Sequence, residues 1–109
     1  MAETFKSRTL DAGTSMGDLI PTVAASTTVI VISCRATNVD GTNDATVDVE
    51  VTDGSSKNAY VAYTMTVPAD SSLELAGTSK LVLQTGDKLQ GLASATSDIE
   101  FFVSYLEIT

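Results

Sequence analysis

Short runs of β-branched and apolar residues recur along the chain from Thr27 onward, and polar turn residues separate most of them. The clearest run lies between Thr46 and Thr52, where valines alternate with Asp48 and Glu50. This period of two is typical of a half-buried strand, with the valines facing inward and the carboxylates outward. No helical period competes with it. The strands predicted in this way are 27–36, 46–52, 60–67, 73–75, 81–83, 89–95 and 99–108.

Two of these strands are apolar on both faces. Strand 27–36 places valines on one face and Ile30, Ile32 and Cys34 on the other, and strand 99–108 is the most hydrophobic of all. A strand of this kind is either covered on both faces or packed at a contact between subunits. We expect the last strand to be central in its sheet, because so apolar an edge would aggregate.

The first 24 residues are less regular. Residues 11–18 are rich in glycine and small polar side chains, and Pro21 argues against a central strand. Residues 4–10 predict either a short strand or an extended arm. We therefore expect 1–24 to be an N-terminal arm and irregular lead-in, with a frayed terminus as the alternative. Residues 25–109 are expected to form a single β-sandwich or jelly-roll-like domain, so that the all-β chain has seven to eight short strands.

The overall charge narrows the range of partners. The 109 residues carry a formal net charge of −8, from 14 acidic and 6 basic side chains. Such a surface repels nucleic-acid phosphates and anionic lipid headgroups, so we expect neither nucleic acid nor membrane as a partner. The chain begins without a basic segment followed by an apolar one, and no run approaches about 20 apolar residues. We expect a soluble protein made in the cytoplasm.

The residues needed for catalysis are scarce. There is no histidine, Cys34 is the one cysteine, and no glycine-rich phosphate loop is present. Cys34 lies in an apolar run, which predicts a buried thiol rather than a reactive one. Asp48 and Glu50 are a carboxylate pair, but a solvated strand face explains them. We expect no enzyme, no catalytic residues and no cofactor.

Two further groups of residues have structural interpretations. Asp40, Asn43, Asp44 and Asp53 are spaced like the oxygen ligands of calcium, but turns favour the same residue types, so no metal is predicted. The three tyrosines are assigned to the core and its margins. These are Tyr60, Tyr63 and Tyr105.

Several motifs recur in a characteristic order along residues 27–108. An apolar strand precedes Asn38-Val39-Asp40-Gly41, and a valine-rich strand leads to the corner Val67-Pro68-Ala69. A leucine-rich segment ends in Gly86-Asp87, and the chain closes with 89–95 and 103–108. In this order and spacing the sequence resembles a group of small virion proteins of tailed bacteriophages that are common in marine phages. The resemblance covers about three-quarters of the chain and leaves out the first 24 residues.

The resemblance implies a β-sandwich or jelly-roll subunit on the virion capsid surface, often a homotrimer, that acts as a capsid cement (decoration) protein. Its partners would be the major capsid protein and other copies of itself. The alternatives are a tail-fibre or head-fibre module that binds a receptor, and a neck or tail adaptor. In the cement hypothesis the N-terminal arm reaches an adjoining capsid subunit. The candidate partner-binding residues are Phe5, Lys6, Arg8 and Leu10.

Overall fold

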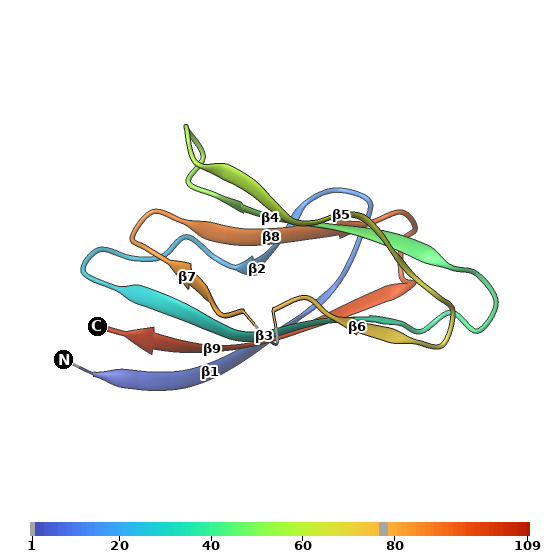
Figure 1. Ribbon diagram of the computed structural model, residues 1–109, viewed down its shortest axis with the longest axis horizontal. Coiled ribbons are helices and arrows are strands. Elements are labelled where there is room, and N and C mark those ends of the chain that lie inside the picture. The colour runs from blue at the N-terminus through green and yellow to red at the C-terminus, as the bar shows by residue number, and fades with distance from the viewer. Residues whose placement is uncertain (1, 77–78) are drawn as a thin grey trace.

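Two antiparallel β-sheets face each other across one core (Figure 1). The computed structural model describes residues 2–76 and 79–109, and within them all nine regular elements are strands. The all-β sandwich expected from the sequence is confirmed. Sheet A runs in the order β1 (Glu3–Asp11), β9 (Ile99–Ile108), β3 (Thr28–Asn38) and β6 (Ser72–Glu74), with β7 (Leu81–Leu83) also paired to β3. Sheet B runs in the order β2 (Gly17–Ile20), β8 (Lys88–Ala93), β4 (Ala45–Thr52) and β5 (Asn58–Val67).

The last strand is central, as predicted, because β9 lies between β1 and β3. The strand that the sequence pattern missed is β2, four residues in a segment rich in small polar side chains. It ends directly before Pro21 and lies at the edge of sheet B. A proline is tolerated there because an edge strand has one side without a ladder.

The N-terminal residues pair with both sheets. Of the two alternatives for residues 4–10, a short strand or an extended arm, the structure has the strand. β1 pairs with β9 from Glu3, opposite Ile108, to Asp11, opposite Glu100. β2 then pairs with β8 in the other sheet. The sequence was expected to divide into an arm at 1–24 and a domain at 25–109. In the structure, β1 and β2 from the expected arm are strands of the same two sheets as the rest of the chain. Contact of these residues with a neighbouring subunit stays a prediction.

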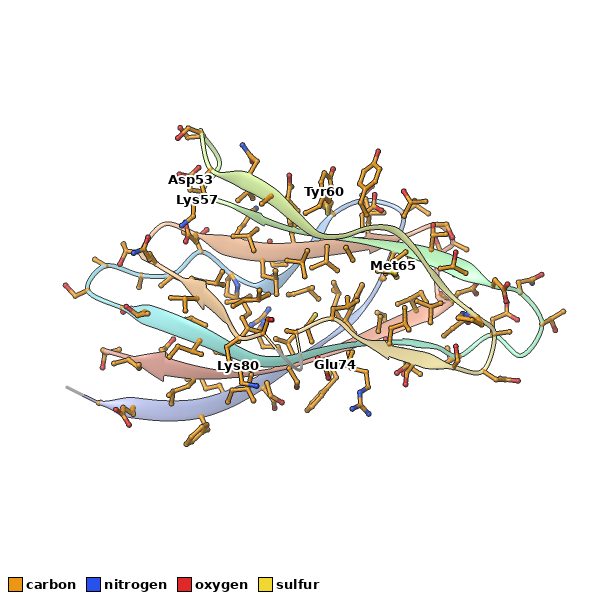
Figure 2. All side chains as sticks on the ribbon, in the orientation of Figure 1. Asp53, Lys57, Tyr60, Met65, Glu74 and Lys80 are labelled. Carbon is orange, nitrogen blue, oxygen red and sulfur yellow. The ribbon has the colours of Figure 1, made fainter. Side chains whose placement is uncertain are left out.

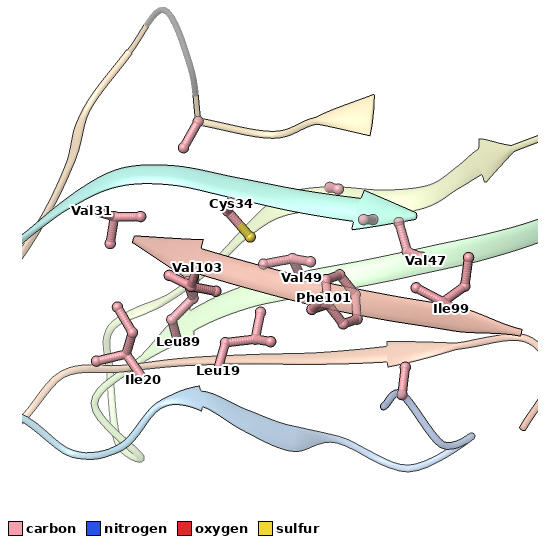
Figure 3. Packing of buried hydrophobic residues seen from close by; sticks show 14 of the residues in the cluster. Leu19, Ile20, Val31, Cys34, Val47, Val49, Leu89, Ile99, Phe101 and Val103 are labelled. Carbon is pink, nitrogen blue, oxygen red and sulfur yellow. The ribbon is translucent and has the colours of Figure 1, made fainter. Parts of the chain in front are cut away.

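The core is built from the inward-facing residues of both sheets (Figure 3). Phe101 of β9 and Leu19 of β2 meet over Gly91 of β8. A Cβ atom at Gly91 would lie 3.2 Å from Leu19 Cδ1 and 3.3 Å from the Phe101 ring, so a glycine is needed for this close approach. Leu83, Leu89 and Ile99 are also fully buried.

A β-bulge changes which way Cys34 points. The pairing of β3 with β9 shifts between Val31 and Ser33, so Ile32 is an extra residue in β3. Beyond it Cys34 points into the core on the same side as Val31, and the sequence-based placement of Cys34 on the opposite face is wrong. The expected buried thiol is confirmed, and burial raises the pKa of Cys34 to about 12.

Candidate assembly surface

The outer face of sheet A carries a row of four apolar side chains. Phe5 of β1 is directly opposite Leu106 of β9, Leu106 is opposite Ile30 of β3, and Ile30 is opposite Val82 of β7. Phe5 is 76% exposed and Val82 56% exposed, whereas Leu106 and Ile30 are half-buried. We call Phe5, Leu106, Ile30 and Val82 the apolar row. Cross-strand neighbours on one face contact each other, so the row forms one continuous apolar strip across the sheet.

A groove lies beside the apolar row. Phe5, Ile32 and Phe102 supply apolar walls, and Ser7 and Ser104 supply hydroxyl groups. Phe102 is 45% exposed, although its neighbour Phe101 is buried in the core. Strand β9 therefore presents one phenylalanine to each side of sheet A. Lys6 and Tyr105 complete its lining, and the groove widens the apolar surface along the outer face.

The other end of this face is acidic. Asp11 of β1 is directly opposite Glu100 of β9, and the two residues line a second groove with Thr9 and Thr37. Like charges in this arrangement weaken the strand pairing unless a cation or solvent screens them. The outer face of sheet A is thus apolar at one end and negatively charged at the other.

The outer face of sheet B has a different character. Asp48 and Glu50 of β4 point outward between buried valines, as predicted, and Glu50 accepts a hydrogen bond from Gln90 Nε2 at 2.7 Å. Two tyrosines of β5 join them, with the Tyr60 and Tyr63 ring centroids 4.7 Å apart in an edge-to-face arrangement. Partial burial, and then the charge of Glu50, raises the pKa of Tyr60.

The core assignment is correct for Tyr105 and wrong for Tyr60 and Tyr63. Tyr105 is 7% exposed, whereas Tyr60 is 50% and Tyr63 68% exposed. Figure 2 shows Tyr60 pointing away from the interior of the sandwich. The cause is irregular pairing, since β5 has one extra residue between the partners of Val47 and Val49 and another between those of Val49 and Glu50. Each extra residue reverses the alternation that the sequence pattern assumes.

The four candidate partner-binding residues do not share a face. Phe5 points outward on sheet A, whereas the other three lie on the inner side of β1. Lys6 Nζ donates to Glu107 Oε1 at 2.9 Å, and this bond and charge raise the pKa of Lys6. Arg8 Nε donates to the Leu19 carbonyl at 3.0 Å and so ties β1 to β2. Leu10 packs against the core, beside Gly17.

Sequence reasoning missed the other members of the apolar row. The signal was present in part, because strands 27–36 and 99–108 were recognised as apolar on both faces. The row itself depends on the register of four strands, which no single strand pattern specifies. A contact role for Phe5, Lys6, Arg8 and Leu10 stays a prediction.

The acidic loop residues hold turns together. Asp40 Oδ1 accepts backbone N–H groups of Thr42 and Asn43 at 2.8 and 3.2 Å. Asp53 Oδ1 accepts those of Ser55 and Lys57 at 2.8 and 3.0 Å. These bonds lower the pKa of both carboxyl groups, and they support the turn interpretation.

The described residues contain no group of three or more histidine, cysteine or acidic side chains placed to hold a metal ion. Nor does any helix in the described part of the chain have the length and hydrophobicity to cross a membrane.

No protein-family model and no curated protein matches this sequence. Solved structures match in fold. A structure of Bacillus endospore appendages, described as a novel family of disulfide-linked pili, is 14% identical with a TM-score of 0.56, over 99% of this chain and 87% of that chain. Two structures of a pentameric capsid protein from metagenomic phage sequences are each 18% identical over 93% of this chain. Their TM-scores are 0.45 and 0.44, and the match spans 59% and 63% of those chains. At 14% identity, the match to the endospore appendage shows a shared fold alone.

Proposed function

We propose that this chain is a non-enzymatic structural subunit of a bacteriophage virion that attaches to the capsid surface as a cement protein. The observation that carries the proposal is the apolar row, an uncovered strip on a folded sandwich. Exposed apolar strips on small proteins mark contact surfaces. The order of motifs along residues 27–108 supplies the phage context, because it resembles small virion proteins.

The proposed mechanism is stabilisation by binding. A subunit that binds the assembled shell and not free capsid protein favours the assembled state by mass action. The outer face of sheet A, with the apolar row, would meet the major capsid protein. The acidic outer face of sheet B would face solvent, where its charge keeps neighbouring copies apart.

A fibre or pilus subunit is the second candidate. The fold likeness to an endospore appendage favours it, since that match covers nearly the whole chain. That appendage is described as disulfide-linked. Here the one cysteine, Cys34, is buried and its thiol pKa is raised to about 12, so this chain would have to join its copies without that bond. A receptor-binding fibre module and a neck or tail adaptor are further alternatives.

The homotrimer stays a prediction that the resemblance alone supports. Three copies around a threefold axis need a heterologous contact, in which two different patches meet. Pairing of the β1 edge with its own copy would not supply such a contact, because that pairing is isologous. The apolar row lies on the outer face of sheet A and would serve the shell in either oligomer.

The test is the number of copies per purified virion of the phage that encodes this chain, measured by quantitative mass spectrometry against the major capsid protein. Hundreds of copies in a simple ratio to the capsid protein are expected for cement. A handful of copies would indicate a neck or tail position, and absence from the particles would contradict a virion role.

Binding to purified capsids tests the surface. Leu106→Glu places a charge in the middle of the apolar row and should abolish sedimentation with capsids. The matched control Glu50→Lys, on the outer face of sheet B, should leave it unchanged. Point variants are preferable to a deletion of residues 2–12, because removing β1 would also expose one side of β9. Equal binding by both variants would contradict the assignment of the surface.

A further inference from the structure

Strand β1 has an open side along its whole length. Ala2 and Thr109 exchange both backbone hydrogen bonds, at 3.1 and 2.9 Å, and the Ala12 N–H donates to the Ile99 carbonyl at 2.9 Å. The pairing between these points has no register shift. In an antiparallel ladder hydrogen-bonded pairs alternate, so even-numbered residues of β1 bond to β9. The N–H and C=O groups of the odd-numbered residues therefore point away from the sheet. These residues are Glu3, Phe5, Ser7, Thr9 and Asp11.

The other sheet edges are short or irregular. On the far side of sheet A, β6 and β7 have three residues each. At one edge of sheet B, β2 has four residues and a register shift. At the other edge, β5 has two bulges, a positive φ of 49° at Thr64, and the Asp48 carboxylate bound to the Thr64 N–H at 2.6 Å. Proteins use such features to prevent edges from pairing with other chains. Among the described strands, β1 alone is a long edge without a bulge or register shift. Its inward-facing charges are engaged within the chain, Lys6 by Glu107 and Arg8 by the Leu19 carbonyl.

We propose that β1 pairs antiparallel with β1 of a second copy of this chain, around a two-fold axis at Phe5. Sheet A then continues through the contact into the partner. The inference rests on strand geometry and does not depend on a capsid role.

A second copy fits this edge better than a foreign strand. Two copies cover residues 3–7 of each other's open side at once, so the part of β1 left open is short (residues 8–11) and the other edges are short or bulged. A single added strand from another protein would cover β1 and present a new open edge itself. The pairing is isologous, as in most homodimers.

The positive charges of Lys6 and Arg8 exclude several positions of the two-fold axis. A two-fold at Lys6 or Arg8 sets that cation opposite its own copy, and a two-fold at Ser7 sets Lys6 opposite Arg8. Like charges directly opposite each other destabilise a strand pair. Two-folds at Phe5 and at Thr9 avoid such pairs.

The apolar row selects Phe5 over Thr9. With the axis at Phe5, the row runs from Val82 through Ile30, Leu106 and Phe5 directly into the same four residues of the partner. Phe5, which is 76% exposed in one copy, then meets its own counterpart. Residues 3–7 of the two copies would exchange about six backbone hydrogen bonds, two for each of three pairs. An axis at Thr9 instead sets Asp11 opposite Ser7 of the partner subunit and leaves the apolar rows of the two copies apart.

A cysteine scan tests the register. Phe5→Cys, Ser7→Cys and Thr9→Cys are oxidised separately in the full chain, alkylated while folded, and run on a denaturing gel. Directly opposite hydrogen-bonded residues lie about 5.5 Å apart, which suits a disulfide. Phe5→Cys should form most of the cross-linked dimer, at least fivefold more than the other two. The native Cys34 is buried and serves as an internal control in every variant.

Proline gives an independent test by light scattering after size-exclusion chromatography. Ser7→Pro removes an N–H group that points away from β9, so the fold should survive while the dimer becomes a monomer. Ser7→Ala keeps the N–H and should remain a dimer. Cross-linking mainly at Ser7 or Thr9, a trimer mass, or a monomer at high concentration for the unsubstituted chain would overturn the proposal. If circular dichroism shows that Ser7→Pro is unfolded, the cysteine scan still tests the β1–β1 contact.

Discussion

The two sheets of this sandwich share one core and differ on the sides that face away from it. Sheet A presents the apolar row and the open edge of β1, whereas sheet B presents Asp48, Glu50 and two tyrosines and has irregular edges. Both outer faces are made of strands with buried valines on the inner side. The difference therefore does not come from the needs of the core. In the proposed function, sheet A contacts another protein and sheet B remains in solvent.

The largest expected effect is the difference in stability lost on truncating Phe101 or Phe102, which point to opposite sides of β9. Phe101 is 1% exposed in the core and Phe102 is 45% exposed on the outer face. Phe101→Ala should lower the free energy of unfolding by about 4 kcal/mol, through lost burial and a cavity. Phe102→Ala should lower it by about 1 kcal/mol or less. Urea unfolding followed by circular dichroism measures both, and equal losses would mean that the outer face also packs within the monomer.

The next effect compares an ion pair beside sheet B with one in sheet A. Lys57 Nζ lies 2.8 Å from Asp87 Oδ2, where the Asp87 side chain is 3% exposed and also accepts the Gln84 N–H. Asp87→Ala should cost about 2 kcal/mol because it removes a buried carboxylate that accepts two hydrogen bonds, one of them from a charged group. The exposed pair of Lys6 and Glu107 should contribute no measurable stability. A large loss in Lys6→Ala, persisting in 1 M salt, would contradict this.

Alkaline pH should lower the stability of the fold by ionising Cys34, which is buried on the inner side of sheet A. The pKa of Cys34 is raised to about 12 from an ordinary value of 9.0. The stability linked to this shift is complete below pH 9 and is lost as pH rises toward 12, because the unfolded thiol ionises first. The loss should be about 1.4 kcal/mol at pH 10, and Cys34→Ala should lack it.

A thiol reagent at pH 8 gives the matching control. It should leave Cys34 unlabelled and label Ile30→Cys on the outer face. Rapid labelling of Cys34 in the folded chain would show that the two sides are not separated as described.

The smallest effect concerns the edge of sheet B. Asp48→Ala removes the carboxylate that accepts the Thr64 N–H at the bulge of β5. The site is exposed, so the expected loss is about 0.5–1 kcal/mol in urea unfolding. The oligomeric mass should not change, because the bulge itself still blocks the edge. A new, larger oligomer in this variant would show that the carboxylate rather than the bulge protects β5.

The alternation of apolar and polar residues predicted most of the strands but few of the residues that share an outer face. Alternation located the strands from Thr28 onward and the outward carboxylates of β4, because burial on one face imposes a period of two. It failed at Ile32 and between Tyr60 and Met65, where an extra residue reverses the alternation. Bulges are set by pairing with another strand, so the local pattern does not contain them.

The candidate site shows the same limit. Phe5 was identified, but it was grouped with Lys6, Arg8 and Leu10 because residues 4–10 were treated as an arm. Once β1 is a strand, neighbouring residues point to opposite sides, and Phe5 joins side chains far away in the sequence. That grouping needs the registers of β1, β9, β3 and β7 together.

Hydrogen–deuterium exchange of the full chain, at concentrations below and above its association, tests most directly whether sheet A is the assembly side. We predict that protection increases in the peptide covering residues 2–11, where the odd-numbered N–H groups are open, and stays unchanged in β5. Increased protection in β5 with none in β1 would contradict the account, because it would assign assembly to the sheet described here as facing solvent.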